Sequence, residues 1–563
     1  METPEKYSPF DRLVGLLKPD KREVRNVYIY AVFSGIVSLS LPLGIQAIIN
    51  LIQGGQISTS WIILVILVVG GVALNGIFQI LQLRITENLQ QNIFTRSAFE
   101  FAYRIPRIKL EELYKHYAPE LMNRFFDTIT VQKGLSKLLI EFSSAALSVI
   151  FGLLLLSFYH PFFLIFSLIL LMLIAGIFQF TATKGMDTSL KESKHKYRVA
   201  HWLEEIARTG TTFKLAGLSE LSLHKTDDLV QDYVKAREGH FKILLQQYSM
   251  LVVFKVLVAL GLLALGGILV MEQLMNVGQF VASEIIILLV MSSVEKMVLS
   301  LESIYDVLTS LEKIGAVLDM KLEDKEGEKI DIHEKEGIAV DLVKVGFRYP
   351  GEFDKVLNDF SLVVKPGEKV AITGQAGSGK SSLLHILAGL YDVTSGNVAF
   401  DGFPKGDLDL LTLRTAIGDF MAQEQIFEGT VEENISLGRD GATREDIKWA
   451  VENVKLKNDF KSVDLEYKTL LDPLGKKLPK SVAVKILLAR SVVIRPRLLL
   501  IEGNLEFVDE TEKKEIIDFL VSPENPWTLI VATTDPYFLS KVNTVVELTE
   551  GELTNLKTNS KLN

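Results

Sequence analysis

Residues 369–389, KVAITGQAGSGKSSLLHILAG, decide the fold of the second half of this 563-residue chain. A short run rich in β-branched residues leads into a glycine-rich turn and then into a helical pattern, the order found around a phosphate-binding loop. The glycines let backbone N–H groups approach phosphate oxygens, and the helix that follows offers its positive N-terminus. We therefore expect a nucleotide to bind here. The alternative is a glycine-rich turn that matches by chance, but the flanking strand and helix patterns disfavour it.

The loop matches the complete P-loop pattern. The predicted ATP-binding residues are Gly374, Gln375, Ala376, Gly377, Ser378, Gly379, Lys380, Ser381 and Ser382. In this pattern Lys380 reaches the β- and γ-phosphates, and the hydroxyl of Ser381 is a ligand of Mg²⁺. ATP and Mg²⁺ are thus the predicted cofactors.

The residues around the loop predict an α/β domain. From residue 337 onward, short β-branched runs alternate with helical patterns, as in GIAVDLVKVGF, KVAITG, RLLLIE and TLIVATT. Such alternation is typical of a largely parallel sheet covered by helices. Residues 316–336 are charged and lack apolar periodicity, which predicts a linker. The expected domains are therefore 1–315, the linker 316–336, and 337–563.

The first domain carries apolar runs of about 20 residues, the length that crosses a bilayer. The six predicted spans are 27–50, 61–83, 139–159, 161–183, 249–271 and 278–300. Three short connectors contain no Lys or Arg, whereas the two long ones are rich in both, so the positive-inside rule places both termini and the second domain in the cytoplasm. The alternative, a buried helical core, explains the charge asymmetry poorly. We expect an integral protein of the inner or plasma membrane.

Composition limits the function further. The chain is 48% hydrophobic and has no cysteine, which excludes disulfides and thiolate metal sites. Its net charge of −9 disfavours a nucleic-acid partner. The first 25 residues are charged and mixed, unlike a cleavable signal peptide.

Three ionisable residues lie in or near the spans: Glu284, Glu141 and Lys255. We expect Glu141 and Lys255 to snorkel, and leave open whether Glu284 lines a cavity.

Six spans followed by a P-loop domain resemble a half-transporter of the ATP-binding cassette (ABC) exporter family, and the resemblance covers nearly the whole chain. It implies a polytopic α-helical membrane domain of the type I exporter kind, followed by an α/β P-loop domain. It also implies that Tyr349, in VGFRYP, stacks on the adenine, and that Gln423, in MAQEQIFEGT, contacts Mg²⁺. A core aromatic remains the alternative for Tyr349. Short helices near 110–118 and 209–217 would couple the two domains.

The segment that resembles the family's signature motif departs from it. In the family this motif reads LSGGQ and contacts the γ-phosphate bound by a second cassette. Here the position is taken by Leu478, Pro479, Lys480, Ser481 and Val482. Both glycines are lost, so side chains hold the backbone away from a phosphate. Lys480 either replaces the lost amide dipoles with a charge or is simply solvated, and we favour the second.

The catalytic positions depart as well. In RPRLLLIEGNLEFVD, residues 495–509, the count forward from Pro496 and the count back from Asp509 both place Glu502 at the metal-binding carboxylate. Gly503 then occupies the position of the general base. Thr534 stands where the family has a histidine on the γ-phosphate, and Asp509 keeps its D-loop position. The catalytic residues are therefore unknown, and so is whether the chain is an ATPase.

Two hypotheses follow from this resemblance. In the first, the chain is a transporter half that dimerises with a second half-transporter, identical or different, and moves a solute, lipid or peptide with impaired or unconventional ATP hydrolysis. In the second, it is a non-hydrolysing regulatory or structural subunit beside an active half. Removing a general base typically lowers a rate by ~10²–10⁴, while ATP binding depends on other residues. Membrane lipid is an expected partner, and an accessory envelope protein remains open.

Overall fold

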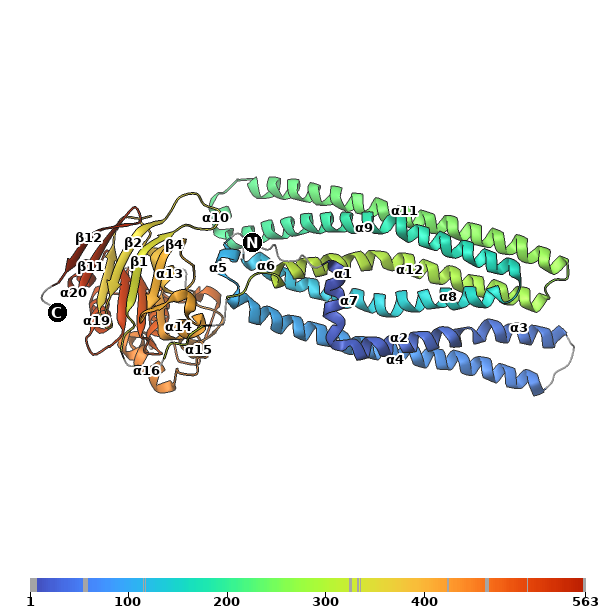
Figure 1. Cartoon of the computed structure of the whole chain (residues 1–563), viewed down its shortest axis with the longest axis horizontal. Helices are drawn as coiled ribbons and strands as arrows, with labels where there is room; N and C mark the ends of the chain where they lie inside the picture. Colours follow the sequence, from blue (N-terminus) through green and yellow to red (C-terminus); the bar gives the residue numbers. More distant parts are fainter. Residues whose placement is uncertain are drawn as a thin grey trace. The chain divides into compact units, whose positions relative to one another are not determined.

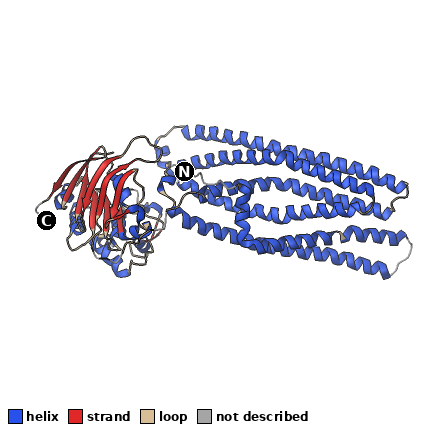
Figure 2. Cartoon of the chain, viewed as in Figure 1, coloured by secondary structure: helices blue, strands red, loops and turns tan. Residues whose placement is uncertain are grey.

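The computed structural model describes residues 8–53, 59–114, 116, 118–323, 327–331, 334, 336–422, 425–460, 465–503 and 505–559. Its contacts divide the chain into two compact units. The helical unit comprises Met1–Pro106 and Tyr117–Met320, and the α/β unit comprises Arg107–His116 and Lys321–Asn563. Figure 2 shows helices in the first unit and the strands in the second. The ten residues Arg107–His116 thus belong by contact to the α/β unit although they interrupt the helical one in sequence.

The helical unit is a bundle of long helices (Figure 1). Its α-helices are α1 (Pro9–Leu17), α2 (Lys21–Ser38), α3 (Ser40–Gln53), α4 (Thr59–Arg104), α6 (Ala118–Asn123), α7 (Asp127–Ser136), α8 (Ser143–Ser157), α9 (Pro161–Arg208), α10 (Gly210–Leu215), α11 (Leu221–Met271) and α12 (Val277–Leu318). Six helical segments are long and apolar enough to cross a membrane, which agrees with the six predicted spans. At 1.5 Å per residue, α4 is about 70 Å long and exceeds a hydrocarbon core of about 30 Å.

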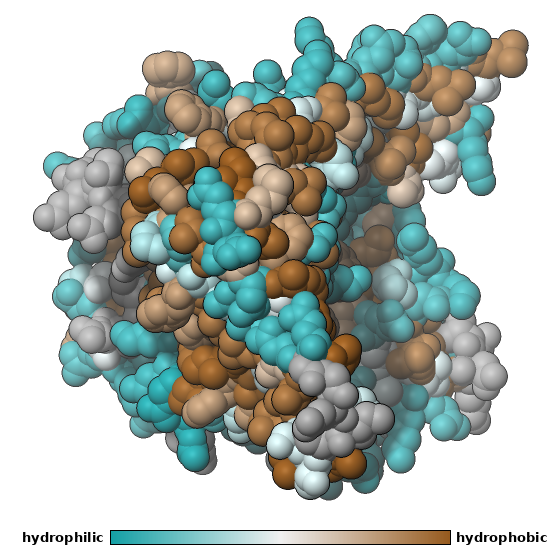
Figure 3. Space-filling model, turned by 90° about the vertical axis from the view of Figure 1, so that its right-hand side faces the viewer, coloured by the Kyte–Doolittle hydropathy of each residue, from teal (hydrophilic) through white to brown (hydrophobic). Residues whose placement is uncertain are grey.

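The surface of the bundle matches a lipid environment. Large apolar side chains are exposed along α4, α9 and α11, among them Ile66, Met172 and Leu260. Figure 3, which looks onto the right-hand end of Figure 1, shows many hydrophobic side chains on that face. An exposed apolar surface of this extent is costly in water and favourable in lipid.

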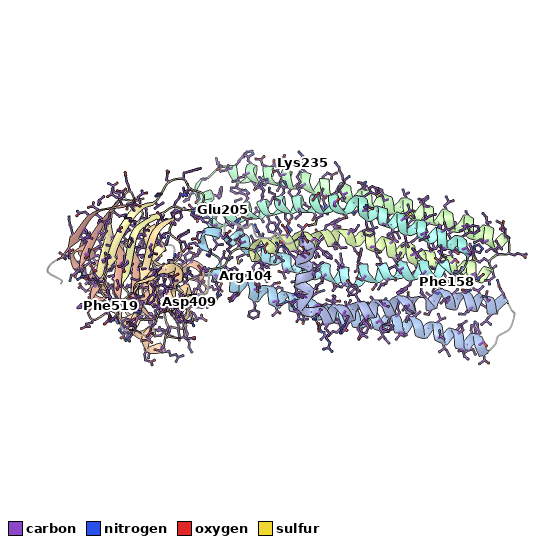
Figure 4. All side chains as sticks on the ribbon, viewed as in Figure 1. Arg104, Phe158, Glu205, Lys235, Asp409 and Phe519 are labelled. Atoms are coloured by element: carbon purple, nitrogen blue, oxygen red, sulfur yellow. The ribbon has the colours of Figure 1, made fainter. Side chains whose placement is uncertain are left out.

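The two ends of the bundle differ in charge. Phe158 lies in the tight turn between α8 and α9 at one end, whereas Arg104 and Glu205 lie toward the other end (Figure 4).

Within the apolar part, the ammonium of Lys255 on α11 pairs with Glu295 on α12 at 2.8 Å. A carboxylate on the neighbouring helix thus neutralises the charge of Lys255, and its snorkelling stays a prediction. Glu284, also on α12, is half-buried.

The α/β unit contains a six-stranded sheet in the order β12-β11-β3-β10-β9-β6. Its strands are β3 (Lys369–Thr373), β6 (Ile417–Phe420), β9 (Leu498–Glu502), β10 (Thr528–Ala532), β11 (Thr544–Thr549) and β12 (Glu552–Thr558). All neighbours pair in parallel except β11 and β12. The central strands are buried on both faces, which explains their continuous apolar sequences.

A second sheet differs from the prediction. It has four strands in the order β2-β1-β4-β5, and all its neighbours pair antiparallel. The strands are β1 (Val340–Phe347), β2 (Leu357–Val364), β4 (Ser395–Phe400) and β5 (Phe403–Pro404). The stretch GIAVDLVKVGF was expected in a largely parallel sheet. Because β1 and β2 are joined by a short connection without a helix, they can pair only antiparallel.

Helices and two very short strands complete the α/β unit. These elements are α5 (Leu110–Leu113), α13 (Lys380–Leu387), α14 (Leu410–Ala416), β7 (Gly429–Thr430), α15 (Val431–Ser436), α16 (Arg444–Asn453), α17 (Leu456–Phe460), β8 (Leu470–Leu471), α18 (Lys480–Val492), α19 (Glu510–Val521) and α20 (Pro536–Lys541). Apolar clusters cover both faces of the six-stranded sheet, one of them including α13 and the other α18. The carboxyl ends of β3, β9 and β10 are left accessible.

Candidate nucleotide site

The predicted P-loop connects β3 to α13, as the pattern requires. Lys369–Thr373 form the strand, and α13 begins at Lys380. Between them Gly374, Gly377 and Gly379 all have positive φ, at 151°, 81° and 102°. A Cβ at Gly374 would lie 2.2 Å from the carbonyl oxygen of Leu548, so a side chain cannot be accommodated there. The loop conformation therefore depends on its glycines.

Lys380 folds over this loop. Its Nζ donates hydrogen bonds to the carbonyl oxygens of Gly374 and Gln375, at 2.9 and 2.7 Å, and lies 3.3 Å from Oγ of Ser378. Burial lowers the pKa of Lys380 and the nearby carboxylate of Glu502 opposes this shift. The ammonium is thus held by weak carbonyl partners, and the phosphates of a nucleotide would be stronger ones.

Ser381 and Glu502 form a pair suited to Mg²⁺. The hydroxyl of Ser381 donates a hydrogen bond to Oε1 of Glu502, and the backbone N–H of Ala422 donates to Oε2 at 3.1 Å. Glu502 is the last residue of β9. A hydroxyl and one carboxylate are oxygen ligands of the kind that hold Mg²⁺ together with water and substrate phosphates. Bound there, Mg²⁺ would neutralise phosphate charge. The described residues contain no group of three or more acidic, His or Cys ligands.

Gly503 and Thr534, the residues predicted at the base and histidine positions, follow β9 and β10. Gly503 comes directly after Glu502, has φ +109°, and donates its N–H to the carbonyl oxygen of Ala532 at 2.9 Å. In the parallel pairing of β9 and β10, Glu502 is opposite Ala532, and Thr534 is two residues further along and exposed. The structure therefore brings Gly503 and Thr534 to the same edge as Glu502. Their assignment to the base and histidine positions stays a prediction.

Tyr349 lies beside the P-loop helix. Its hydroxyl is 2.9 Å from Oγ of Ser382, a buried residue of α13. The ring is half-buried and contacts Phe347 and Tyr391 edge to face. It also stacks on Tyr114, which follows α5. Tyr114 was not predicted here, because no sequence pattern in the connector marks it as a neighbour of residue 349.

The segment in the signature position begins α18. Pro479 is the N-cap residue, and its side chain cannot accept a hydrogen bond from the first turn. The Nζ of Lys480 lies 4.7 Å from the ring centroid of Phe507. We expected Lys480 to be simply solvated, but it makes this cation–π contact although it is exposed. By the same resemblance, Phe507 occupies a position where the family usually has a small residue, so the contact joins two residues that are predicted to depart from the family pattern.

Four further predicted residues have different outcomes. Asp509 caps α19, and its carboxylate accepts a hydrogen bond from the N–H of Thr511 at 3.0 Å. Leu478 is partly buried against the apolar core around α18, and Val482 is buried within it. Gln423, the predicted contact of Mg²⁺, lies outside the described residues.

Comparisons with known families agree with this architecture. The model of the ABC transporter transmembrane region matches residues 25–294, and the model of the ABC transporter domain matches residues 357–502. The second match contains the P-loop and ends at Glu502. Together the two matches cover most of the helical bundle and the strands β3 and β9.

Individual relatives are more distant. The chain is similar to the transport/processing ATP-binding protein ComA of Streptococcus pneumoniae, with 27% identity over 331 residues, which is 58% of this chain and 46% of that protein. It is 28% identical over 253 residues to the cyclolysin secretion/processing ATP-binding protein CyaB of Bordetella pertussis, 45% of this chain and 35% of that protein. The aligned parts thus span less than half the length of these relatives.

A solved structure shares the fold over most of the chain. It is described as the structure of a bacterial Atm1-family ABC exporter with ATP bound. The TM-score is 0.84 at 17% sequence identity, and the superposition covers 96% of each chain. At this identity the likeness concerns the fold alone.

Proposed function

Because the chain belongs to the ABC transporter family as a half-size exporter, we propose that it dimerises with a second half-transporter and binds ATP with impaired hydrolysis. The cargo would be a solute, lipid or peptide, carried across the inner or plasma membrane with both termini and the α/β unit in the cytoplasm. One observation carries the hydrolysis part. The Ser381–Glu502 pair is directly followed by Gly503, which offers no carboxylate.

Further residues support the separation of binding from hydrolysis. Lys380, Ser381 and Glu502 retain the groups that bind phosphate and Mg²⁺. A general base and hydrogen-bond donors aimed at the developing charge normally speed hydrolysis, and Gly503, Thr534 and the signature segment lack them. Such groups act as a unit, so their losses do not simply multiply. In a homodimer, both sites would be affected alike.

ATPase measurements on the purified, reconstituted chain test the proposal. Turnover is measured for the chain alone and together with candidate partner half-transporters, with Lys380→Ala as the control. We expect saturable ATP binding with turnover far below that of an intact ABC exporter. Fast turnover by the chain alone would contradict impaired hydrolysis, and absence of ATP binding would contradict the whole proposal.

A second candidate function uses the same site without turnover. The contact between Lys480 and Phe507 holds the altered signature segment to its own chain, which favours a subunit that binds ATP as a regulatory or structural ligand. Turnover equal to that of Lys380→Ala under every pairing would support this candidate. A gain of turnover in Gly503→Glu combined with Thr534→His would support the assigned positions.

A further inference from the structure

We propose that Tyr114 competes with the nucleotide base for the ring of Tyr349, so that base binding displaces the connector segment that carries Tyr114. The inference rests on the ATP binding of the proposed function and on the prediction that Tyr349 stacks on the adenine. It adds a residue from the connector between α4 and α7 to the nucleotide site. All the contacts involved lie within the α/β unit.

The two tyrosine rings form a stacked pair. Their centroids are 5.1 Å apart and their planes differ by 13°, an offset-stacked arrangement. Carbon atoms in contact are already about 3.5–4.0 Å apart, so a flat base cannot enter between the rings unless one of them moves by a similar distance. The base and Tyr114 therefore exclude each other on this face of Tyr349.

Of the three rings that contact Tyr349 in the described part of the chain, Tyr114 is the one that can leave. Phe347 and Tyr391 belong to the apolar core and are only 2% and 5% exposed. Tyr114 is 45% exposed and follows α5, a helix of four residues. Tyr349 itself is held through its hydroxyl by Ser382, a buried residue of α13. A base that takes a face of the Tyr349 ring thus displaces Tyr114 rather than the core.

The anchors of the connector confine this displacement to one part of it. Ile108 forms an antiparallel bridge with Leu322, and the N–H of Lys109 donates to the carbonyl oxygen of Lys321 at 3.0 Å. Glu111 accepts a hydrogen bond from the N–H of Asp392 at 3.0 Å. Among the described residues after Glu111, the backbone N–H groups of Leu113, Tyr114 and His116 donate within the segment itself, to the carbonyl oxygens of Lys109, Leu110 and Leu113. Base binding would therefore change the conformation around Tyr114.

Affinity measurements with two probes test the competition. ATP and inorganic tripolyphosphate are titrated against the full chain and against Tyr114→Ala. Loss of a stacked aromatic pair changes an equilibrium constant by about two- to tenfold, so Tyr114→Ala should bind ATP tighter by about this factor. Its affinity for tripolyphosphate should not change, because that probe has no base. Tyr114→Phe, which keeps the ring, should match the wild type.

The opposite results would overturn the competition. Weaker or unchanged ATP binding by Tyr114→Ala would exclude competition between Tyr114 and the base. The proposed function would still stand in that case, provided that the wild type binds ATP saturably. If the wild type binds neither probe, the proposed function fails first. If ATP affinity in Tyr349→Ala is unchanged, Tyr349 is not the base-binding ring.

A spectroscopic measurement follows the displacement directly. Because the chain has no cysteine, His116→Cys provides a single site for a spin label next to the exposed end of the connector. The mobility of this label should rise on addition of ATP and stay constant on addition of tripolyphosphate. An equal response to both probes, or no response to ATP, would show that the base does not move the connector.

Discussion

The P-loop region and the signature region of the α/β unit differ in how well they suit a nucleotide. Around the P-loop, three glycines with positive φ, Lys380 and the Ser381–Glu502 pair form a set of groups suited to phosphate and Mg²⁺. In the signature region, the side chain of Pro479, the N-cap residue of α18, offers no hydrogen-bond acceptor, and Lys480 contacts Phe507 of its own chain. The comparison separates the groups that would bind ATP from the positions on which the proposed impairment of hydrolysis depends.

The largest expected effect concerns Lys380. Lys380→Ala removes the ammonium expected on the phosphates, and a hydrogen bond to a charged group is worth about 1.5–3 kcal/mol, or about 10- to 100-fold in affinity. ATP affinity is measured by titration of the full chain. Lys365→Ala removes an exposed lysine from the turn before β3 and is the matched control. Equal affinities in both variants would show that the P-loop region does not bind the phosphates.

Substitution of Glu502 tests whether the P-loop region also binds Mg²⁺. Glu502→Gln removes the charge beside Ser381, so we expect ATP binding in the presence of Mg²⁺ to weaken by about tenfold. Binding measured with EDTA in place of Mg²⁺ should change little. Glu524→Gln, at an exposed position after α19, is the control. A loss of the same size with EDTA would mean that Glu502 acts on the loop conformation and not on Mg²⁺.

Substitutions of Gly503, which directly follows Glu502, test whether the backbone at the predicted base position can carry a side chain. Its φ of +109° is unfavourable for residues with a Cβ, although a Cβ there would meet no atom within 4 Å. Left-handed backbone costs such residues roughly 1–2 kcal/mol. Gly503→Ala and Gly503→Glu should therefore lower the thermal unfolding midpoint of the full chain by similar amounts. A much larger drop for Glu would indicate a crowded position instead.

The same backbone conformation limits any gain of catalysis. A well-positioned general base contributes ~10²–10⁴ in rate. Because a residue at 503 would be strained, we expect Gly503→Glu with Thr534→His to raise turnover by less than this range. ATPase assays against Gly503→Ala with Thr534→His separate the carboxylate from the change in backbone. A gain in turnover over the whole ~10²–10⁴ range would mean that the altered signature segment contributes little to the slow hydrolysis.

The sequence allowed much of this architecture to be predicted, because its main signals are local. The P-loop appears as a strand, loop and helix in consecutive residues, and each span is one continuous apolar run. The antiparallel pairing of β1 with β2 was missed, since β-branched runs predict a strand but not its partner. Contacts such as Tyr114 with Tyr349 and Lys255 with Glu295 join separate elements. Only the tertiary packing determines them.

The contact between Lys480 and Phe507 gives the smallest expected effect. Its coupling energy tests whether this contact stabilises the signature region. Phe507 is 54% exposed, and a cation–π contact at such a site is worth about 0.5–1 kcal/mol. In denaturant titrations of the full chain, Lys480→Ala and Phe507→Ala should each destabilise slightly. The double variant should lose less unfolding free energy than the sum of the two single losses, and the difference is the coupling energy.

A neighbouring lysine provides the control for this cycle. Lys477 pairs with Asp472 at 3.0 Å, so Lys477→Ala combined with Phe507→Ala should be additive. Coupling in the first cycle and additivity in the second would show that two departures from the family pattern stabilise each other within one chain. Additivity in both would leave Lys480 solvated, as its sequence context first indicated, and available to a phosphate on a second chain.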